Sequence, residues 1–338
     1  MTDDRKGFPA VDPLGMPPLA VGDTALTDAP PAHGSATVSD ELALAYVSGL
    51  EVKSRSQWAY ARRRFVRHRL AMISLVVLLV ILGAGAAADW IAPYAYDEID
   101  LENSGVGPTL DGRHYFGTDV LGRDYFSRVI YGIRTSERVA LIVASLATLI
   151  GVLVGAIAGY YGRWIDNVLM RFTDLVLTLP GLAVLLTASA FLGNGNQYRV
   201  AVILALLFWT TLARIVRGSF LSLREKEYVE AARAAGSGDL RIMFRHILPN
   251  AMGPIIVNAT LIIGLAILIE AALSFLGFGI QPPTPALGKL ISDGQDVASQ
   301  FWWLVTFPGL TIVLIVLCIN FIGDGLRDAL DPTQRTRA

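Results

Sequence analysis

The sequence of 338 residues contains little charge and a single cysteine. Charged residues make up 17% of the chain, hydrophobic residues make up 53%, and the mean hydropathy is +0.51. This composition leaves too little polar surface to cover a soluble domain, so it predicts a protein whose solvent is the lipid bilayer. The lone Cys318 stands in an apolar run and has no second cysteine with which to form a disulfide within the chain.

Motifs of several catalytic and binding classes are also missing. The chain has no G-x-x-x-x-G-K-[ST] loop to cradle ATP phosphates and no HExxH zinc motif. Its four histidines are scattered along the sequence, at His33, His68, His114 and His246, which argues against a metal cluster. A net charge of −1 gives no general basic surface for nucleic acid. We therefore expect no catalytic residue, no metal site, no cofactor in this chain and no nucleic-acid partner.

Residues 1–60 differ from the rest because Pro, Ala, Gly and Asp dominate and apolar side chains are sparse. Such a segment cannot offset its ordering entropy by burying apolar surface. We predict a disordered, in part amphipathic, tail on the cytoplasmic side. No basic start leads into a short apolar run near the N-terminus, so we expect no signal peptide.

Six segments are predicted to cross the membrane, because a spanning helix needs about 20 mostly apolar residues. These segments are Leu70–Ala88, Val139–Tyr161, Leu175–Leu192, Val200–Arg217, Ala251–Ile280 and Phe301–Ile322. Together they predict an all-α polytopic membrane domain over residues 61–332, followed by a cytoplasmic tail at residues 333–338. Within the second segment Gly151, Gly155 and Gly159 recur every four residues, which favours close approach of a neighbouring helix.

The fourth and fifth segments are atypical. The charge-free part of the fourth runs only from Val200 to Ala213, so a tilted or re-entrant segment is an alternative. Arg199, Arg214 and Arg217 are expected to snorkel toward headgroups. The fifth contains Glu270, whose charge is costly within a bilayer. We expect the fifth helix to be broken or to carry this carboxylate inside the bundle, in an ion pair or a backbone cap rather than against substrate.

The lysine and arginine bias of the short loops sets the predicted orientation. Arginines precede the first segment, follow the second and crowd residues 218–250 after the fourth, which places these regions and both termini in the cytoplasm. Residues 89–138 then form a long outer loop, which crosses with little regard to its own charge. In this loop we expect a turn held by Asp119, Arg123 and Asp124. We also expect an interfacial helix, with one apolar face made of Tyr125, Phe126, Val129, Ile130 and Ile133.

Residues 218–250, which we call the elbow, predict two short helices at an angle. Residues 227–235 favour a helix, Gly236 suits a C-terminal cap, and Ser237 is placed to cap a second helix that starts near Asp239. Pro249 is expected to end this second helix. Its apolar positions fall on one face and its arginines on another, as a ridge that fits a groove on a soluble partner. The apolar set is Leu240, Met243, Phe244 and Ile247, and the arginines are Arg241 and Arg245.

The stretch YVEAARAAGSGDLRIMFRHILPN at Tyr228–Asn250 resembles the EAA loop of ATP-binding-cassette (ABC) importer permeases. The match lies in Glu230, Ala231 and Ala232, with Gly236 four positions later. It continues in Leu248 and Pro249, and the HILPN ending resembles the peptide-importer branch. Three further stretches are similar to the C-type permease of dipeptide, oligopeptide and nickel importers. They are FGTDVLGRDYFSRVIYGIRTS at Phe116–Ser136, MRFTDLVLTLP at Met170–Pro180, and LSFLGFGIQPPTPALGKLISDG at Leu273–Gly294.

The resemblance covers roughly residues 60–332 and implies a non-catalytic subunit of a type I ABC importer in the bacterial cytoplasmic membrane. The implied partners are a B-type permease, one fused or two separate ATP-binding subunits that bind ATP and Mg, and an external solute-binding protein. Peptides are the leading substrate class, with nickel chelates, glutathione and oligosaccharides as alternatives. The residues implied to couple to the ATPase are Glu230, Ala231, Ala232, Gly236, Asp239, Leu240, Met243, Phe244, Arg245, Leu248 and Pro249.

Two other classes remain open at the level of the sequence. An ion-driven secondary transporter needs no ATPase, but it usually carries acidic or histidine relays within several spans, and Glu270 is nearly alone here. A membrane scaffold or receptor would use the elbow as a docking site without a translocation path. The residues that bind substrate are not identified by the sequence.

Overall fold

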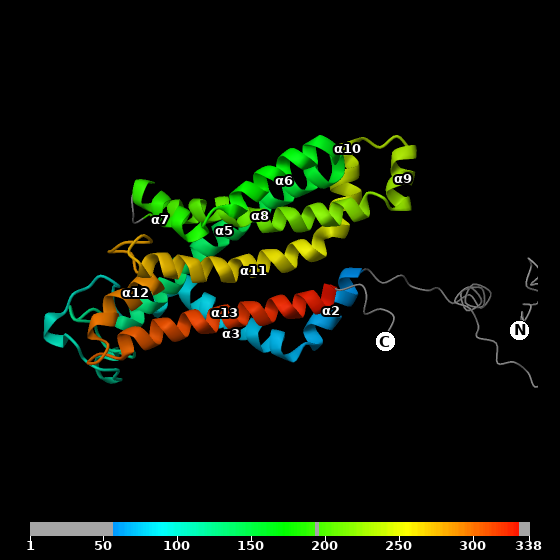
Figure 1. The fold of residues 1–338 in the computed structure, drawn as a ribbon. Helices are drawn as coiled ribbons and strands as arrows, with labels where there is room; N and C mark the ends of the chain where they lie inside the picture. Colours follow the sequence, from blue (N-terminus) through cyan, green and yellow to red (C-terminus); the bar gives the residue numbers. More distant parts are fainter. Residues whose placement is uncertain (1–56, 193–195, 331–338) are drawn as a thin grey trace, which may run out of the picture. The chain divides into compact units, whose positions relative to one another are not determined.

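The computed structural model describes residues 57–192 and 196–330. Within these ranges the chain is helical and forms no strand, which confirms the all-α prediction. The predicted tails fall mostly outside the described residues. The main helices are α2 (Gln57–Arg67), α3 (Arg69–Ala86), α4 (Ala88–Ile91), α5 (Tyr125–Tyr161), α6 (Arg163–Thr178), α7 (Gly181–Leu192), α8 (Gln197–Leu223), α9 (Glu227–Ala234), α10 (Asp239–Arg241), α11 (Leu248–Phe275), α12 (Leu287–Gly294) and α13 (Trp303–Leu330) (Figure 1).

Five helical stretches are long and apolar enough to cross a membrane, and the bent pair of α6 and α7 makes a sixth candidate. The predicted third span, residues 175–192, is wrong as a continuous helix, because α6 and α7 meet at an angle of 82°. Leu179 has an extended backbone, as a residue before a proline prefers, and Pro180 separates the two helices. The span therefore breaks close to its predicted start.

The fourth span is longer than predicted and is not re-entrant, since α8 runs unbroken from Gln197 to Leu223. Arg217 does not snorkel. Its Nε lies 2.5 Å from Asp166 Oδ1 and its Nη2 lies 2.6 Å from Asp166 Oδ2, which joins α8 to α6. Arg214 forms a second pair with Asp174, at 2.5 Å. Paired with carboxylates, both cations are accommodated on a helix that the sequence made look too short.

The second span starts earlier than predicted, because α5 begins at Tyr125 and takes in the last part of the predicted outer loop. The Asp124 carboxylate caps this helix by accepting a hydrogen bond from the Ser127 backbone N–H at 2.7 Å. The predicted interfacial helix is also wrong. Tyr125 and Val129 are 2% and 1% exposed, and the Tyr125 hydroxyl donates to the backbone oxygens of Leu290 and Leu304. This segment is packed inside the protein.

The glycines of α5 face α8 and confirm the predicted close approach. A Cβ atom at Gly151 would lie 2.9 Å from the Trp209 carbonyl oxygen, and one at Gly159 would lie 2.6 Å from the Phe220 Cβ. At Gly155 a Cβ would overlap the Ala213 carbonyl. The α5 and α8 backbones are therefore in direct contact, as small residues permit in membranes.

The fifth and sixth spans differ at their ends from the predicted ranges. Helix α11 ends at Phe275, where Gly277 has a positive φ of 85° and Phe278 N–H bonds back to the Leu273 carbonyl, whereas the sequence placed the end at Ile280. The last helix, α13, runs on from Trp303 to Leu330.

Glu270 is inside the bundle and fully buried, which is the second of the two predicted alternatives. It accepts hydrogen bonds from the hydroxyls of Ser136, at 2.9 Å, and Ser274, at 2.7 Å. The expected ion pair or backbone cap is not formed, since both partners are serine hydroxyls. Ser274 Oγ also accepts from the Ile280 backbone N–H, so Glu270 joins α5 and α11 to the chain that leads into α12.

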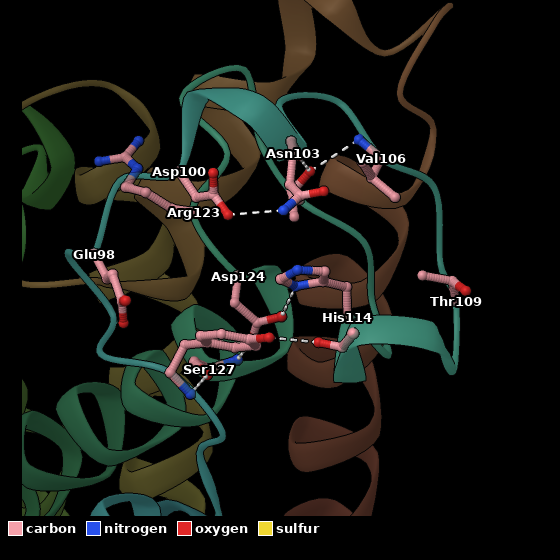
Figure 2. A network of polar contacts seen from close by, with 12 residues as sticks. Glu98, Asp100, Asn103, Val106, Thr109, His114, Arg123, Asp124 and Ser127 are labelled. Carbon is pink, nitrogen blue, oxygen red and sulfur yellow. Dashed lines mark hydrogen bonds and ion pairs between the residues drawn. The ribbon is translucent and has the colours of Figure 1, made fainter.

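The segment between α4 and α5 folds against the end of the bundle that also holds α12, opposite the end that carries α9 (Figure 1). Asp119 holds the predicted turn by pairing with Arg123 at 2.7 Å and with Arg128 at 2.5 Å. Nearby, buried His114 Nδ1 lies 3.0 Å from Asp124 Oδ1, as Figure 2 shows. These contacts make a fixed cap at this end of the protein.

Candidate functional site

The candidate site is the elbow, whose first short helix is α9. This helix ends in the cap that the sequence predicted. Gly236 has a φ of 78°, and the Ser237 backbone N–H reaches back to the Ala232 carbonyl at 3.1 Å. Glycine adopts this left-handed conformation without the steric cost that a Cβ imposes. The bond also shows why Ser237 fails as the predicted cap of the next helix, since it closes the first helix and Gly238 starts the second.

The second elbow helix does not stop before the fifth span. Residues 239–241 are α-helical, Ile242–Ile247 form a π-helix, and α11 follows without a break. The prediction that Pro249 ends the helix is wrong, because Pro249 lies inside this continuous helix, two residues after the end of the π-helix. The wider π turn lies just before this proline. The elbow is thus covalently and helically continuous with α11.

The π turn also changes which side chains are exposed, so the predicted ridge is split. Met243 and Ile247 are 3% and 0% exposed and face the protein, whereas Leu240 and Phe244 are 68% and 47% exposed. Leu240 and Phe244 share the outside with Arg241 and Arg245. Of the other predicted coupling residues, Ala232 and Leu248 are half-buried, and the exposed ones are Glu230, Ala231, Gly236, Asp239 and Pro249.

Three buried aliphatic residues anchor the elbow: Val229 on α9, and Ile242 and Ile247 on the π-helix, each 0% exposed. The sequence analysis missed Val229 and assigned no role to Ile242. Val229 is an isolated aliphatic residue within a polar stretch, and Ile242 stands directly before Met243. Because they are fully buried, the elbow is held to the bundle by its inner face, while its outer face stays open.

A polar contact ties the elbow to the end of α5. The Tyr160 hydroxyl donates to Asp239 Oδ1 at 2.7 Å, and Tyr160 itself is 8% exposed. Arg224, at the end of α8, donates to the carbonyl oxygens of Gly159 and Tyr160 at 3.1 and 3.2 Å. This junction could not be predicted from the sequence, because its members are far apart along the chain.

The start of α9 and the start of α11 also lie close together. Burial raises the pKa of the Tyr228 phenol, and the nearby Asn250 side chain acts in the opposite direction. Tyr228 stands at the start of α9, and Asn250 stands in the first turn of α11. This contact brings the start of α9 close to the start of α11.

A mostly apolar groove of about 520 Å³ lies at the α6–α7 bend, between α8 and α11. Its polar lining is limited to Thr210, Thr211 and Asn258. The Asn258 side-chain amide donates to the Pro254 carbonyl at 2.9 Å. The part of the chain that the structure describes holds no cluster of His, Cys, Asp or Glu able to bind a metal. The two surface features described here are the exposed outer face of the elbow and the groove at the α6–α7 bend.

Two family models match the sequence. Residues 151–336 match the family described as "binding-protein-dependent transport system inner membrane component". Residues 56–108 match the "N-terminal TM domain of oligopeptide transport permease C". The two matches together take in nearly all the described helices.

Several curated proteins are similar over most of their length. The chain is 41% identical to the dipeptide transport system permease protein DppC of Alkalihalophilus pseudofirmus, over 83% of this chain and 91% of that protein. It is 39% identical to the oligopeptide transport system permease protein OppC of Haemophilus influenzae, over 86% and 93%. A putative peptide transport system permease of Brucella abortus is 43% identical over 80% and 90%.

Among solved structures, an inward-facing form of the MetNI methionine ABC transporter aligns with a TM-score of 0.49 and 18% identity. The alignment covers 61% of this chain and 97% of that one.

Proposed function

The chain belongs to the family of binding-protein-dependent transport system inner membrane components, in its oligopeptide permease C branch, and we propose that it forms, with a B-type permease, the path of an ATP-driven peptide importer. Its role in such an importer is transport, and it is a multi-pass membrane protein. Peptides are the proposed cargo because the relatives at 39–43% identity carry dipeptide, oligopeptide or peptide transport names.

The elbow is the proposed dock for a cytoplasmic ATP-binding subunit, which would supply ATP hydrolysis. The observation that carries this proposal is the division of the elbow into two faces. Val229, Ile242 and Ile247 are buried against the bundle, while Leu240 and Phe244 are exposed among arginines. Exposed apolar side chains beside cations suit a groove on a soluble partner, and the buried anchors keep the elbow from yielding when the partner moves.

Two connections offer routes for movement from the elbow into the membrane. The π-helix leads directly into α11, and the hydrogen bond from Tyr160 to Asp239 leads into α5. Moving a two-state gate from 1:99 to 99:1 takes about 5.5 kcal/mol of differential binding. A contact that transmits several kcal/mol must be stiff, and a continuous helix backed by buried side chains meets that need.

The elbow end of the bundle is the proposed cytoplasmic end, and the α12 end with its fixed cap is the proposed outer end. The arginine-rich segments before α3 and after α8 support this orientation. An external solute-binding protein would then meet the capped end. The groove at the α6–α7 bend is the proposed surface toward the B-type permease and the path, since it combines an apolar wall with Thr210, Thr211 and Asn258.

Reconstituted vesicles test the proposal. The full chain is assembled with a B-type permease and the ATP-binding subunits, and uptake of labelled peptides is measured with the solute-binding protein present. We expect uptake only when ATP and every subunit are supplied. Uptake that follows an imposed ion gradient without ATP would identify a secondary transporter instead, and ATP-dependent uptake of another solute with no uptake of peptides would replace the cargo.

A further inference from the structure

Helix α2 carries an exposed cationic face that the transport function does not use. It is an 11-residue helix, QWAYARRRFVR, and His68 separates it from α3. The His68 side chain caps α3 by accepting a hydrogen bond from the Ala71 N–H at 3.1 Å. Because α3 is a membrane-spanning candidate that begins at Arg69, α2 lies at the entrance of the first span.

Close packing on α13 fixes the position of α2. A Cβ atom at Gly325 would lie 2.5 Å from the Ala71 Cβ and 3.3 Å from Phe65 Cε2. His68 Nε2 also lies 3.9 Å from the Asp328 carboxylate. Helix α2 lies beside the end of α13 (Figure 1), and its inner face packs against that helix.

The opposite face is cationic and partly apolar. Arg62, Arg63 and Arg67 are exposed, and Val66 and Tyr60, at 56% and 49% exposed, stand among them. The sequence contains no aspartate or glutamate from residue 52 to residue 88, so these charges meet no acid along their own segment. Asp328, from the neighbouring α13, lies beside His68.

The level of this face in the membrane decides what it meets. Helix α3 is long and apolar enough to cross a membrane and starts two residues after Arg67, which would place the α2 face at the depth of the lipid headgroups. Arginines near a membrane surface attract anionic lipids, and apolar or aromatic side chains between them enter the headgroup region. A soluble polyanion would match the arginines but not the exposed Val66.

We propose that the α2 face made of Arg62, Arg63 and Arg67, with Val66 and Tyr60 between them, binds the phosphate headgroups of anionic phospholipids. The loop rule for positive charge explains the number of arginines before the first span. It does not explain why they share one helix face with exposed apolar side chains while the other face is seated on α13.

A lipid bound at this face would also restrain the end of α13, which packs beside the start of α11. The last described residue, Leu330 on α13, lies close to Gly253, where a Cβ would be 3.6 Å from the Leu330 Cβ. Gly253 stands one turn after Pro249 on α11. The lipid face, the end of α13 and the start of the elbow-driven helix thus form a row of direct contacts.

Native mass spectrometry tests the proposal on the full chain, delipidated in a neutral detergent and titrated with phosphatidylglycerol. We expect saturable binding of phosphatidylglycerol and at least tenfold weaker binding of phosphatidylcholine. A variant with Arg62→Gln, Arg63→Gln and Arg67→Gln is expected to bind phosphatidylglycerol roughly a hundredfold more weakly, since each arginine accounts for about fivefold. The corresponding triple lysine variant keeps the charge and is expected to bind like the parent.

The matched control is the double variant Arg163→Gln and Arg171→Gln, at exposed positions outside α2. It should leave phosphatidylglycerol binding unchanged. If the triple glutamine variant does not fold, each single Arg→Gln change should still show its roughly fivefold loss. Equal binding of the two lipids, or unchanged binding by the glutamine variants, overturns the proposal. Displacement of the lipid by an equal concentration of inorganic phosphate would identify a free-anion site and overturn it as well.

Discussion

The Tyr160 hydroxyl lies 2.7 Å from Asp239 Oδ1 and joins the last turn of α5 to the first turn of the second elbow helix. These residues are 79 positions apart in the chain. The hydrogen bond gives the elbow a lateral connection to a second membrane helix, besides its direct continuation into α11.

Replacing Tyr160 with Phe removes this hydrogen bond and keeps the packed ring. A bond of this kind contributes about 1 kcal/mol, so we expect the peptide taken up per ATP hydrolysed to fall roughly fivefold, with little change in the amount of assembled transporter. The adjacent Tyr161, whose ring is 43% exposed, gives the matched control Tyr161→Phe. Equal coupling ratios in Tyr160→Phe and the parent would show that the lateral connection carries no force.

Leu240→Ala and Phe244→Ala should weaken association with the ATP-binding subunit, because both side chains are exposed and would be buried by it. Burying a large apolar side chain stabilises an interface by about 1.5–3 kcal/mol, which corresponds to roughly a ten- to hundredfold loss of affinity per substitution. The measurement is the affinity of the ATP-binding subunit for this protein embedded in nanodiscs. Phe191→Ala, at an 86% exposed position on α7, is the control and should change nothing. Unaltered affinity in both elbow variants would place the dock elsewhere.

Gly155→Ala should destabilise the protein, since a Cβ there overlaps the Ala213 carbonyl of α8. Overpacking of this kind costs about 1–3 kcal/mol. Gly218, on α8, has open space around it, with nothing within 4 Å of the position that a Cβ would take, so Gly218→Ala should be neutral or stabilising. Thermal unfolding in detergent compares the two. A midpoint for Gly155→Ala at or above that of Gly218→Ala would mean that α5 and α8 are not in backbone contact.

Glu270→Gln should fold and Glu270→Ala should not fold stably. Glutamine preserves the size of the side chain and a hydrogen-bonding partner for Ser136 and Ser274, whereas alanine leaves both hydroxyls without it and opens a cavity. The combined cost of the alanine is about 2–5 kcal/mol. Yield and unfolding midpoint are the measurements, with Ser136→Ala expected to cost about 1 kcal/mol. A glutamine variant as unstable as the alanine variant would show that the site needs a charge.

Periodicity and apolar run length predicted most of the membrane helices, because those signals act locally along the chain. The errors arose where a contact between distant residues decided the outcome. Arg217 fits in α8 because Asp166 on α6 pairs with it, and Tyr125 is buried because α12 and α13 fold over it. These partners are distant in sequence, so the local pattern around Arg217 or Tyr125 does not predict them.

The two prolines at helix junctions show the same limit from another side. Pro180 and Pro249 both follow a leucine, yet the first separates two helices at 82° and the second lies inside a continuous one. The difference comes from the π-helix before Pro249, which could not be predicted from the sequence. At the elbow, the residue pattern located the cap at Gly236, but it assigned Met243 to the outer face because it assumed a regular α-helix.

The glycine faces between α5 and α8 have a mechanical consequence. Because the α5 and α8 backbones are in direct contact at these glycines, the two helices cannot separate without losing their packing along this interface. We therefore expect α5 and α8 to move as one unit whenever this subunit opens or closes.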